Sequence, residues 1–221
     1  MFLKQKDIAI FLLLIFALIR CNEVGKESGN KKTTTIGIQP LGNFDRSLID
    51  TVKQTIINIY GFDVIALKRL DIPEEAYTNI KSPRYRADTL IRYLRRIKPD
   101  SIDYILGLTS KDISVTKKDK FGNIKQPEYK YKDWGIFGLA FVPGLSCIVS
   151  TFRLKSNNSK FIERFKKICI HELGHNLGLS HCDNYKQCVM RDAAETIKTI
   201  DQVDLMLCNK CKNEIGMKRH K

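Results

Sequence analysis

The stretch that decides the fold spans residues 171–181 and reads HELGHNLGLSH. It ends a segment, residues 160–177, whose apolar spacing predicts a helix with Ile168, His171 and His175 on one face. Two histidines one helical turn apart can bind the same metal ion. Glu172 lies beside them and can reach a water on that metal without being a ligand. The helix is therefore expected to carry a metal site with a general base.

The residues after this helix predict a third ligand. Gly178 can take the left-handed conformation that ends a helix and reverses the chain, which allows His181 to return toward the metal. Three histidines leave the fourth tetrahedral position open for water, which is typical of a catalytic zinc. The alternative is a core helix whose histidines have buried hydrogen-bond partners. The added glycine and third histidine favour the zinc site.

Four cysteines follow the histidines, at positions 182, 188, 208 and 211. Cys182, Cys188, Cys208 and Cys211 suit a closed tetrahedral zinc site that folds a small C-terminal subdomain. Two disulfides, Cys182–Cys188 and Cys208–Cys211, are the alternative, and export to an oxidising compartment would favour them. We expect two zinc ions per chain, one catalytic and one structural.

Upstream of residue 160, strand patterns alternate with helix patterns. Strands are expected at residues 34–41, 62–67 and 102–108, and helices at residues 45–60 and 84–98. This order predicts an α/β fold with parallel strands joined by crossover helices. Residues 136–142 and 147–154 flank Pro143-Gly144 and predict a hairpin that adds an antiparallel edge strand. The charged segment 111–133 is expected to form an exposed loop or ragged hairpin.

Residues 1–21 have the order of an export signal. Lys4 and Lys6 precede twelve uncharged residues, 8–19, and Cys21 follows shortly after. This run is shorter than the roughly 20 residues that a transmembrane helix needs. Cys21 resembles the acylated cysteine of a bacterial lipoprotein, although Arg20 stands where a small residue is usual. Ordinary cleavage after Cys21, an uncleaved anchor, and a cytoplasmic protein with a buried N-terminal helix are the alternatives.

The segments at the two ends complete the expected organisation. Residues 22–33 are polar and predict a flexible linker between the signal and the domain, and residues 214–221 form a basic tail. We therefore expect an exported protein of the cell envelope, anchored at the membrane through its N-terminus.

Composition narrows the class of protein. Of the 221 residues, 43% are hydrophobic and 28% charged, which excludes a collagen, a long disordered tail and a multi-span membrane protein. The net charge of +14 suggests an anionic partner. No nucleic-acid motif accompanies it and the basic residues are scattered, so we expect a nearby anionic membrane and no nucleic acid. The odd number of cysteines, seven, argues against a fully paired disulfide scaffold.

Together these motifs resemble the archaemetzincin family. The match comprises residues 171–181, then Cys182, then Cys188-Val189-Met190, and, seventeen residues later, Cys208-x-x-Cys211. Similarity extends upstream to Arg86-Ala87-Asp88, Gly107-Leu108-Thr109 with Asp112, Phe137-Gly138-Leu139-Ala140, and residues 146–154. The resemblance covers about residues 34–213. One departure is that five residues, 183–187, separate the first two cysteines, where the family usually has four.

The resemblance implies a metzincin-like zincin fold: a twisted mixed sheet with an antiparallel edge strand, an active-site helix, and a zinc-bound C-terminal subdomain in which Met190 forms the methionine turn. It implies a zinc metallopeptidase that acts on peptide or protein substrates, with a zinc-bound water activated by Glu172. Residues 147–154 would be the sheet edge that pairs with an extended substrate. Aminopeptidase-like cleavage and internal cleavage both stay open, as does the oligomeric state. A zinc-stabilised peptide-binding module without catalysis is the alternative function.

Overall fold

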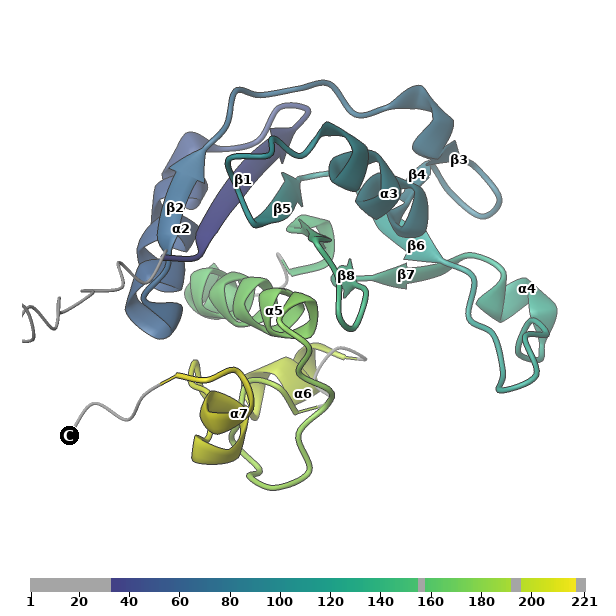
Figure 1. Ribbon diagram of the computed structural model, residues 1–221. Helices are drawn as coiled ribbons and strands as arrows, with labels where there is room; N and C mark the ends of the chain where they lie inside the picture. The colour runs from purple at the N-terminus through teal and green to yellow at the C-terminus, as the bar shows by residue number, and fades with distance from the viewer. Residues whose placement is uncertain (1–32, 155–157, 192–195, 218–221) are drawn as a thin grey trace, which may run out of the picture. The chain divides into compact units, whose positions relative to one another are not determined.

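The computed structural model describes residues 33–154, 158–191 and 196–217 (Figure 1). The expected export segment, residues 1–21, and the linker as far as residue 32 lie outside the described residues, as do the last four residues of the tail. In the described part of the chain, none of the helices combines the length and the apolar character needed to cross a membrane.

A five-stranded mixed sheet forms the centre of the domain. Its strands are, in spatial order, β2 (Asp63–Ala66), β1 (Thr35–Leu41), β5 (Tyr104–Thr109), β9 (Ser146–Ser150) and β8 (Gly138–Ala140). The first four are parallel to one another, and β8 pairs with β9 in antiparallel fashion. The expected antiparallel edge strand is confirmed.

The expected position of the sheet edge is wrong. Strand β9 lies between β5 and β8, so the edge is formed by β8 and not by residues 147–154. Strand β9 stops at Ser150 because its Oγ accepts a hydrogen bond from the Phe152 backbone N–H at 3.1 Å and donates one to the Lys111 carbonyl at 2.6 Å. The chain then turns into a short 3-10 helix, Phe152–Leu154.

Helices cover both faces of this sheet. Helix α3 (Ala87–Ile97) packs on one face, and α2 (Arg46–Tyr60) and α5 (Phe161–Asn176) pack on the other (Figure 1). Successive side chains of a strand point to opposite faces of the sheet, so one strand contributes to the hydrophobic core on each face. In β5, Leu106 and Leu108 belong to the core beneath α2 and α5, whereas Ile105 belongs to the core beneath α3. The sequence predicted these three helices and three of the four parallel strands, β1, β2 and β5, whereas β9 was expected only as part of a hairpin.

A second sheet of four short strands was not expected. It contains β3 (Tyr77–Thr78), β4 (Arg84–Arg86), β6 (Ile113–Val115) and β7 (Trp134–Ile136), in that order. The helix expected from residue 84 begins only at Ala87, because Arg84 donates hydrogen bonds to Asp112 at 2.8 Å and to Asp133 at 3.0 Å, and these hold the chain extended as β4. The segment expected to form an exposed loop or ragged hairpin, residues 111–133, contains β6 and the short helix α4 (Glu128–Tyr131). An antiparallel bridge between Lys118 and Ile124 agrees with the hairpin alternative.

Two short helices, α6 (Ile197–Asp201) and α7 (Asn209–Glu214), lie after the histidines. From the sequence, residues 200–207 predict a short helix with Val203 and Leu207 facing inward. The helix instead spans Ile197–Asp201, since Thr196 caps its first turn by accepting a hydrogen bond from the Thr199 backbone N–H at 3.2 Å. Val203 and Leu207 are nevertheless buried, as predicted. Arg164 of α5 forms two hydrogen bonds of 2.7 Å with Asp201, which joins this C-terminal part to α5.

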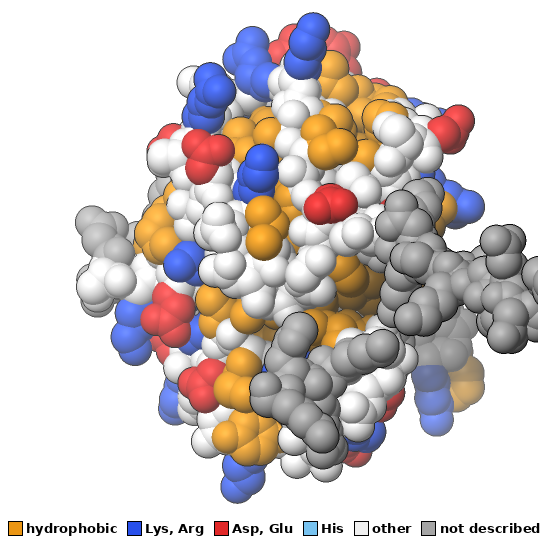
Figure 2. Space-filling view, turned by 60° about the vertical axis from the view of Figure 1, so that its left-hand side comes forward, with side chains coloured by type: hydrophobic (Ala, Val, Ile, Leu, Met, Phe, Trp, Pro, Cys, Tyr) orange, Lys and Arg blue, Asp and Glu red, His pale blue; other side chains and the backbone are white. Residues whose placement is uncertain are grey.

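The excess positive charge is not gathered on the face shown in Figure 2. Lys and Arg side chains lie there among Asp, Glu and hydrophobic side chains. Exposed ion pairs such as Arg92–Asp88 at 2.9 Å and Arg96–Glu75 at 3.1 Å neutralise part of the charge on α3.

Candidate metal centres

The three predicted histidine ligands come together at the C-terminal end of α5. His171 and His175 lie one turn apart, with their Nε2 atoms 3.0 Å from each other. The chain reverses at Gly178, whose φ of 98° is in the left-handed region, and His181 then approaches the other two rings with centroids 5.4 and 5.0 Å away. One possible ligand atom from each histidine lies within 4.8 Å of the others. The expected turn and the expected grouping are both present.

Backbone carbonyls orient two of these rings. His171 Nδ1 lies 2.8 Å from the Val189 carbonyl, and His175 Nδ1 lies 2.7 Å from the Leu179 carbonyl. A carbonyl only accepts, so each Nδ1 carries the proton and each Nε2 keeps its lone pair for a metal. A tetrahedral zinc with Zn–N bonds of about 2.0–2.1 Å would space two nitrogens about 3.3 Å apart, close to the spacing observed here. Burial lowers the pKa of His171 to about 3, which keeps the ring neutral.

Glu172 shares a cleft with the three histidines. The cleft measures about 400 Å³ and is lined by Gly138, Leu139, Ala140, Val142, His171, Glu172, His175, Ser180 and His181. Edge strand β8 approaches so closely that a Cβ on Gly138 would lie 2.7 Å from Glu172 Oε1. Burial raises the pKa of Glu172 to about 8, and a cation at the histidines would act in the opposite direction. A buried carboxylate is thus held between the histidines and the sheet edge.

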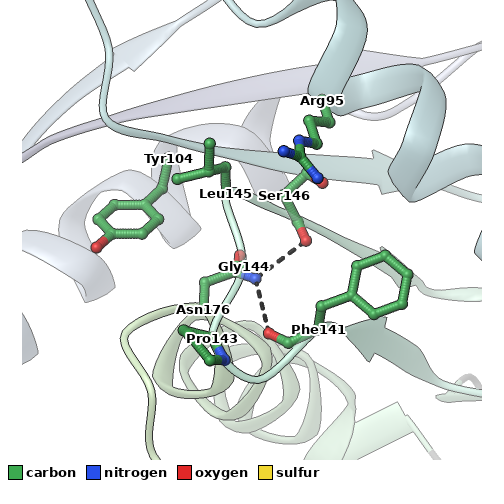
Figure 3. A pocket seen from close by; sticks show the side chains of 8 residues that line it. All are labelled: Arg95, Tyr104, Phe141, Pro143, Gly144, Leu145, Ser146 and Asn176. Carbon is green, nitrogen blue, oxygen red and sulfur yellow. Dashed lines mark hydrogen bonds between the residues drawn. The ribbon is translucent and has the colours of Figure 1, made fainter.

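Asn176 anchors the end of α5 to the loop between β8 and β9 (Figure 3). Its Nδ2 donates to the Ser146 carbonyl at 3.0 Å and to the Phe141 carbonyl at 3.4 Å, and its own backbone carbonyl accepts from Gly144 at 3.3 Å. The same loop lines a cavity of about 380 Å³ on the side toward α3, which Figure 3 shows in close-up. Asn176 was not predicted as a site residue, and Gly138 entered only as part of the run of residues 137–140 that resembles the family. The signal for Asn176 was a polar residue on the buried side of the helix, directly after His175.

The four cysteines form the second cluster. Cys182 Sγ lies 3.6 Å from Cys208 Sγ, and Cys211 Sγ lies 3.8 Å from Cys188 Sγ and 3.7 Å from Cys208 Sγ. A tetrahedral zinc with Zn–S bonds of about 2.3 Å would space its sulfurs about 3.8 Å apart, so the cluster fits that ion. All cysteines in the described residues are free thiols, so neither alternative disulfide is formed. Burial raises the pKa of Cys211, and a dication is what would let all four sulfurs ionise.

The tripeptide Cys188-Val189-Met190 connects the two clusters. Cys188 belongs to the sulfur cluster, and the Val189 carbonyl accepts from His171. Met190 is fully buried and packs against α5 between the two helical histidines, where a Cβ on Gly174 would lie 2.3 Å from Met190 Sδ. The five residues between Cys182 and Cys188 include a turn, in which the Cys188 backbone N–H donates to the Tyr185 carbonyl at 3.0 Å.

Comparisons with known proteins agree with this geometry. The model of Peptidase family M54 matches residues 32–217. Archaemetzincin of Halobacterium salinarum is 30% identical over 192 residues, covering 81% of this chain and 98% of that protein. Archaemetzincin of Nanoarchaeum equitans is 31% identical over 175 residues, covering 79% of this chain and 86% of that protein.

Solved structures give the same result. The crystal structure of archaemetzincin from Methanopyrus kandleri has a TM-score of 0.68 at 26% identity and covers 84% of this chain and 95% of that one. The structure from Archaeoglobus fulgidus, complexed with malonate, has a TM-score of 0.64 at 27% identity and covers 82% of this chain and 99% of that one. The chain therefore belongs to peptidase family M54, the archaemetzincins, and is a zinc metallopeptidase that acts on peptide substrates.

Proposed function

We propose that His171, His175 and His181 hold the catalytic zinc and that Glu172 is the general base of peptide hydrolysis. The observation that carries this proposal is the shared cleft, in which one buried carboxylate lies beside three imidazoles. Two of the imidazoles are held with Nε2 available by backbone carbonyls. A binding module would not need a buried carboxylate at this place.

The residues of the cleft have different roles in hydrolysis. Zinc, when bound, lowers the pKa of its water and polarises the scissile carbonyl. Glu172 takes the proton of the attacking water and delivers it to the leaving amine. The carbonyls of Val189 and Leu179 keep the two helical imidazoles in the tautomer that presents Nε2. The peptide bond is thereby split with one proton passing through Glu172.

Strand β8 is the proposed binding edge for the substrate. It is the last strand of its sheet in the part of the chain that the structure describes, and it lines the cleft with Gly138, Leu139 and Ala140. An extended peptide can add to such an edge through main-chain hydrogen bonds. Aminopeptidase-like cleavage is one form of this reaction. Matched peptides with free and acetylated N-termini test it, because an aminopeptidase cleaves only the free ones.

The test of the mechanism compares wild type with Glu172→Ala. Turnover of a peptide library should fall by about 10²–10⁴-fold, which is the usual cost of losing a general base. Zinc content and peptide binding should be unchanged, whereas the control variant His175→Ala should lose the catalytic zinc. Equal turnover in wild type and Glu172→Ala would remove Glu172 from the mechanism. Peptide binding without turnover in either protein would favour the non-catalytic module.

We also propose two zinc ions per chain, with Cys182, Cys188, Cys208 and Cys211 holding the second, structural ion. The support is the near-tetrahedral spacing of the four sulfurs and their burial. A subdomain with helices as short as α6 and α7 buries little apolar surface of its own, and a bound ion can supply the missing stability.

For localisation, we propose export and membrane anchoring through residues 1–21. The support comes from the sequence alone: two lysines, an uncharged run and Cys21 in the order of a lipoprotein signal. Cys21→Ser should release the domain from membranes or block processing, as measured by fractionation and intact mass. A cytoplasmic, soluble protein that retains Met1 would contradict the proposal.

A further inference from the structure

A basic pocket lies outside the catalytic cleft, where the second sheet meets the chain leading to β8. It measures about 190 Å³ and is lined by Lys81, Arg84, Lys130, Asp133, Trp134, Gly135 and Arg153. Arg153 covers the backbone of β7 so closely that a Cβ on Gly135 would lie 2.1 Å from its guanidinium carbon. Glycine at this position lets the guanidinium form part of the pocket wall.

The negative charges near this pocket are buried beneath its positive ones. Asp112 accepts from Arg84 at 2.8 Å and from Arg153 at 2.7 and 2.8 Å, and Asp133 accepts from Arg84 at 3.0 Å. The side chains of Asp112 and Asp133 are only 5% and 0% exposed. The surface that solvent meets is therefore basic.

Two lysines at the rim add charge without a counterion. Lys81 Nζ donates to the Lys130 backbone carbonyl at 2.7 Å, which leaves its other protons available. Lys130 Nζ lies 5.6 Å from the centre of the Trp134 indole. In the described part of the chain neither lysine pairs with a carboxylate. Both lysines line the same pocket, and a bound anion would offset their positive charges.

The basic pocket and the catalytic cleft lie along one stretch of chain. Strand β7 ends at Ile136 and β8 begins at Gly138, so only Phe137 separates them. Each is the last strand of its own sheet among the described residues. Gly138 is four positions after Trp134, and because the chain bends at Phe137 the two positions lie at most about 13 Å apart. A peptide lying along β8 would reach the basic pocket three or four residues from the scissile bond.

We propose that the basic pocket binds a carboxylate of the peptide substrate, that is, an acidic side chain or the terminal carboxylate three or four residues from the cleaved bond. The inference rests on the proposed peptidase function and names a feature of its substrate. Lys81 and Lys130 supply mobile ammonium groups, and Arg84 and Arg153 supply guanidinium groups that Asp112 and Asp133 hold in place. The indole of Trp134 forms the apolar wall.

Trp134 is the only tryptophan in the chain, so its fluorescence reports on this pocket directly. The first experiment titrates the full-length, zinc-loaded protein with an alanine-based peptide that contains two glutamates and with the same peptide containing two glutamines. We expect a saturable change with the glutamate peptide only. The affinity for the glutamate peptide should fall about threefold to tenfold in the double variant Lys81→Ala/Lys130→Ala, since exposed ion pairs contribute only modestly to the binding free energy. The affinity of the wild-type protein for this peptide should also fall as the salt concentration rises.

The matched control is Lys68→Ala/Arg69→Ala, which removes two exposed charges just after β2, at the opposite edge of the five-stranded sheet. It should bind the glutamate peptide as wild type does. An equal response to the glutamine peptide, or none to either, would overturn the proposal. A titration with inorganic phosphate that matches the glutamate peptide in affinity would mean a general anion site and would also overturn it.

A second experiment measures cleavage of peptides in which one glutamate is moved along the sequence. We expect kcat/KM to peak when the glutamate stands three or four residues from the cleaved bond on one side, with the peak lost in Lys81→Ala/Lys130→Ala. If kcat/KM does not depend on the position of the glutamate, the proposed role of the basic pocket is refuted and the proposed peptidase function is not. A positive fluorescence titration with no cleavage of any peptide would instead refute the proposed function.

Discussion

Gly138→Ala tests whether the sheet edge places the general base. A Cβ at residue 138 would lie 2.7 Å from both Cγ and Oε1 of Glu172. Ordinary carbon contacts are about 3.5–4.0 Å, so the Glu172 side chain must move by roughly 0.8 Å. Glu172 is 3% exposed, so the room for this movement is in the cleft itself, away from β8. A misplacement on the order of 1 Å near the reacting groups can cost about 10²-fold in rate, which is the loss that we expect.

The same substitution should leave the fold and the metal in place. Alanine is more favourable than glycine in a strand by about 0.5–1 kcal/mol, which offsets much of the crowding. The assay measures kcat/KM, zinc content and the urea midpoint for wild type, Gly138→Ala, Glu172→Ala and the double variant. In the double variant the atoms that clash are gone, so Gly138→Ala should cause no further loss. Undiminished turnover in Gly138→Ala, or a second loss in the double variant, would refute the reasoning.

Two further predictions concern the metal clusters. Gly174→Ala should lower the free energy of unfolding by about 1 kcal/mol, because overpacking against Met190 costs about 1–3 kcal/mol while the gain in helix propensity is about 1 kcal/mol. Urea titration of the zinc-loaded protein measures the change, and a variant more stable than wild type would contradict the clash. Cys211→Ser should remove the structural zinc and leave the catalytic one. Elemental analysis of the purified variant decides this, and loss of neither ion would argue against the cysteine site.

The grouping of the histidines could be predicted because it depends on local geometry. Helical periodicity alone places His171 and His175 on one face, and Gly178 supplies the turn that returns His181. The cysteines also have recognisable spacing, yet the sequence left zinc and disulfides open. Which sulfurs meet depends on how residues 182–188 fold against residues 208–211, and the structure brings all four together as free thiols.

Other features depend on contacts between distant segments and had no local signal. Strands β4, β6 and β7 have three residues each, too few to show a period of two. The sequence around Gly138 and Gly174 does not show what these two glycines contact. Their importance comes from Glu172 and Met190, which the tertiary fold brings within van der Waals reach. The sheet edge is a further case, since β9 pairs with β5 on one side and with β8 on the other, and residues 147–154 carry no local signal of that second pairing.

The two clusters share one short piece of chain, and this argues that the cysteine cluster does more than stabilise the C-terminal part. Cys188 contributes a sulfur, the next residue contributes the carbonyl that orients His171, and Met190 packs beneath the helix that carries the histidines. The Met190 carbonyl also accepts from the Cys182 backbone N–H at 2.8 Å, so both ends of this tripeptide are tied to cysteines of the cluster. A metal held by the cysteines would therefore limit the movement of the Val189 carbonyl and, through it, of the His171 ring.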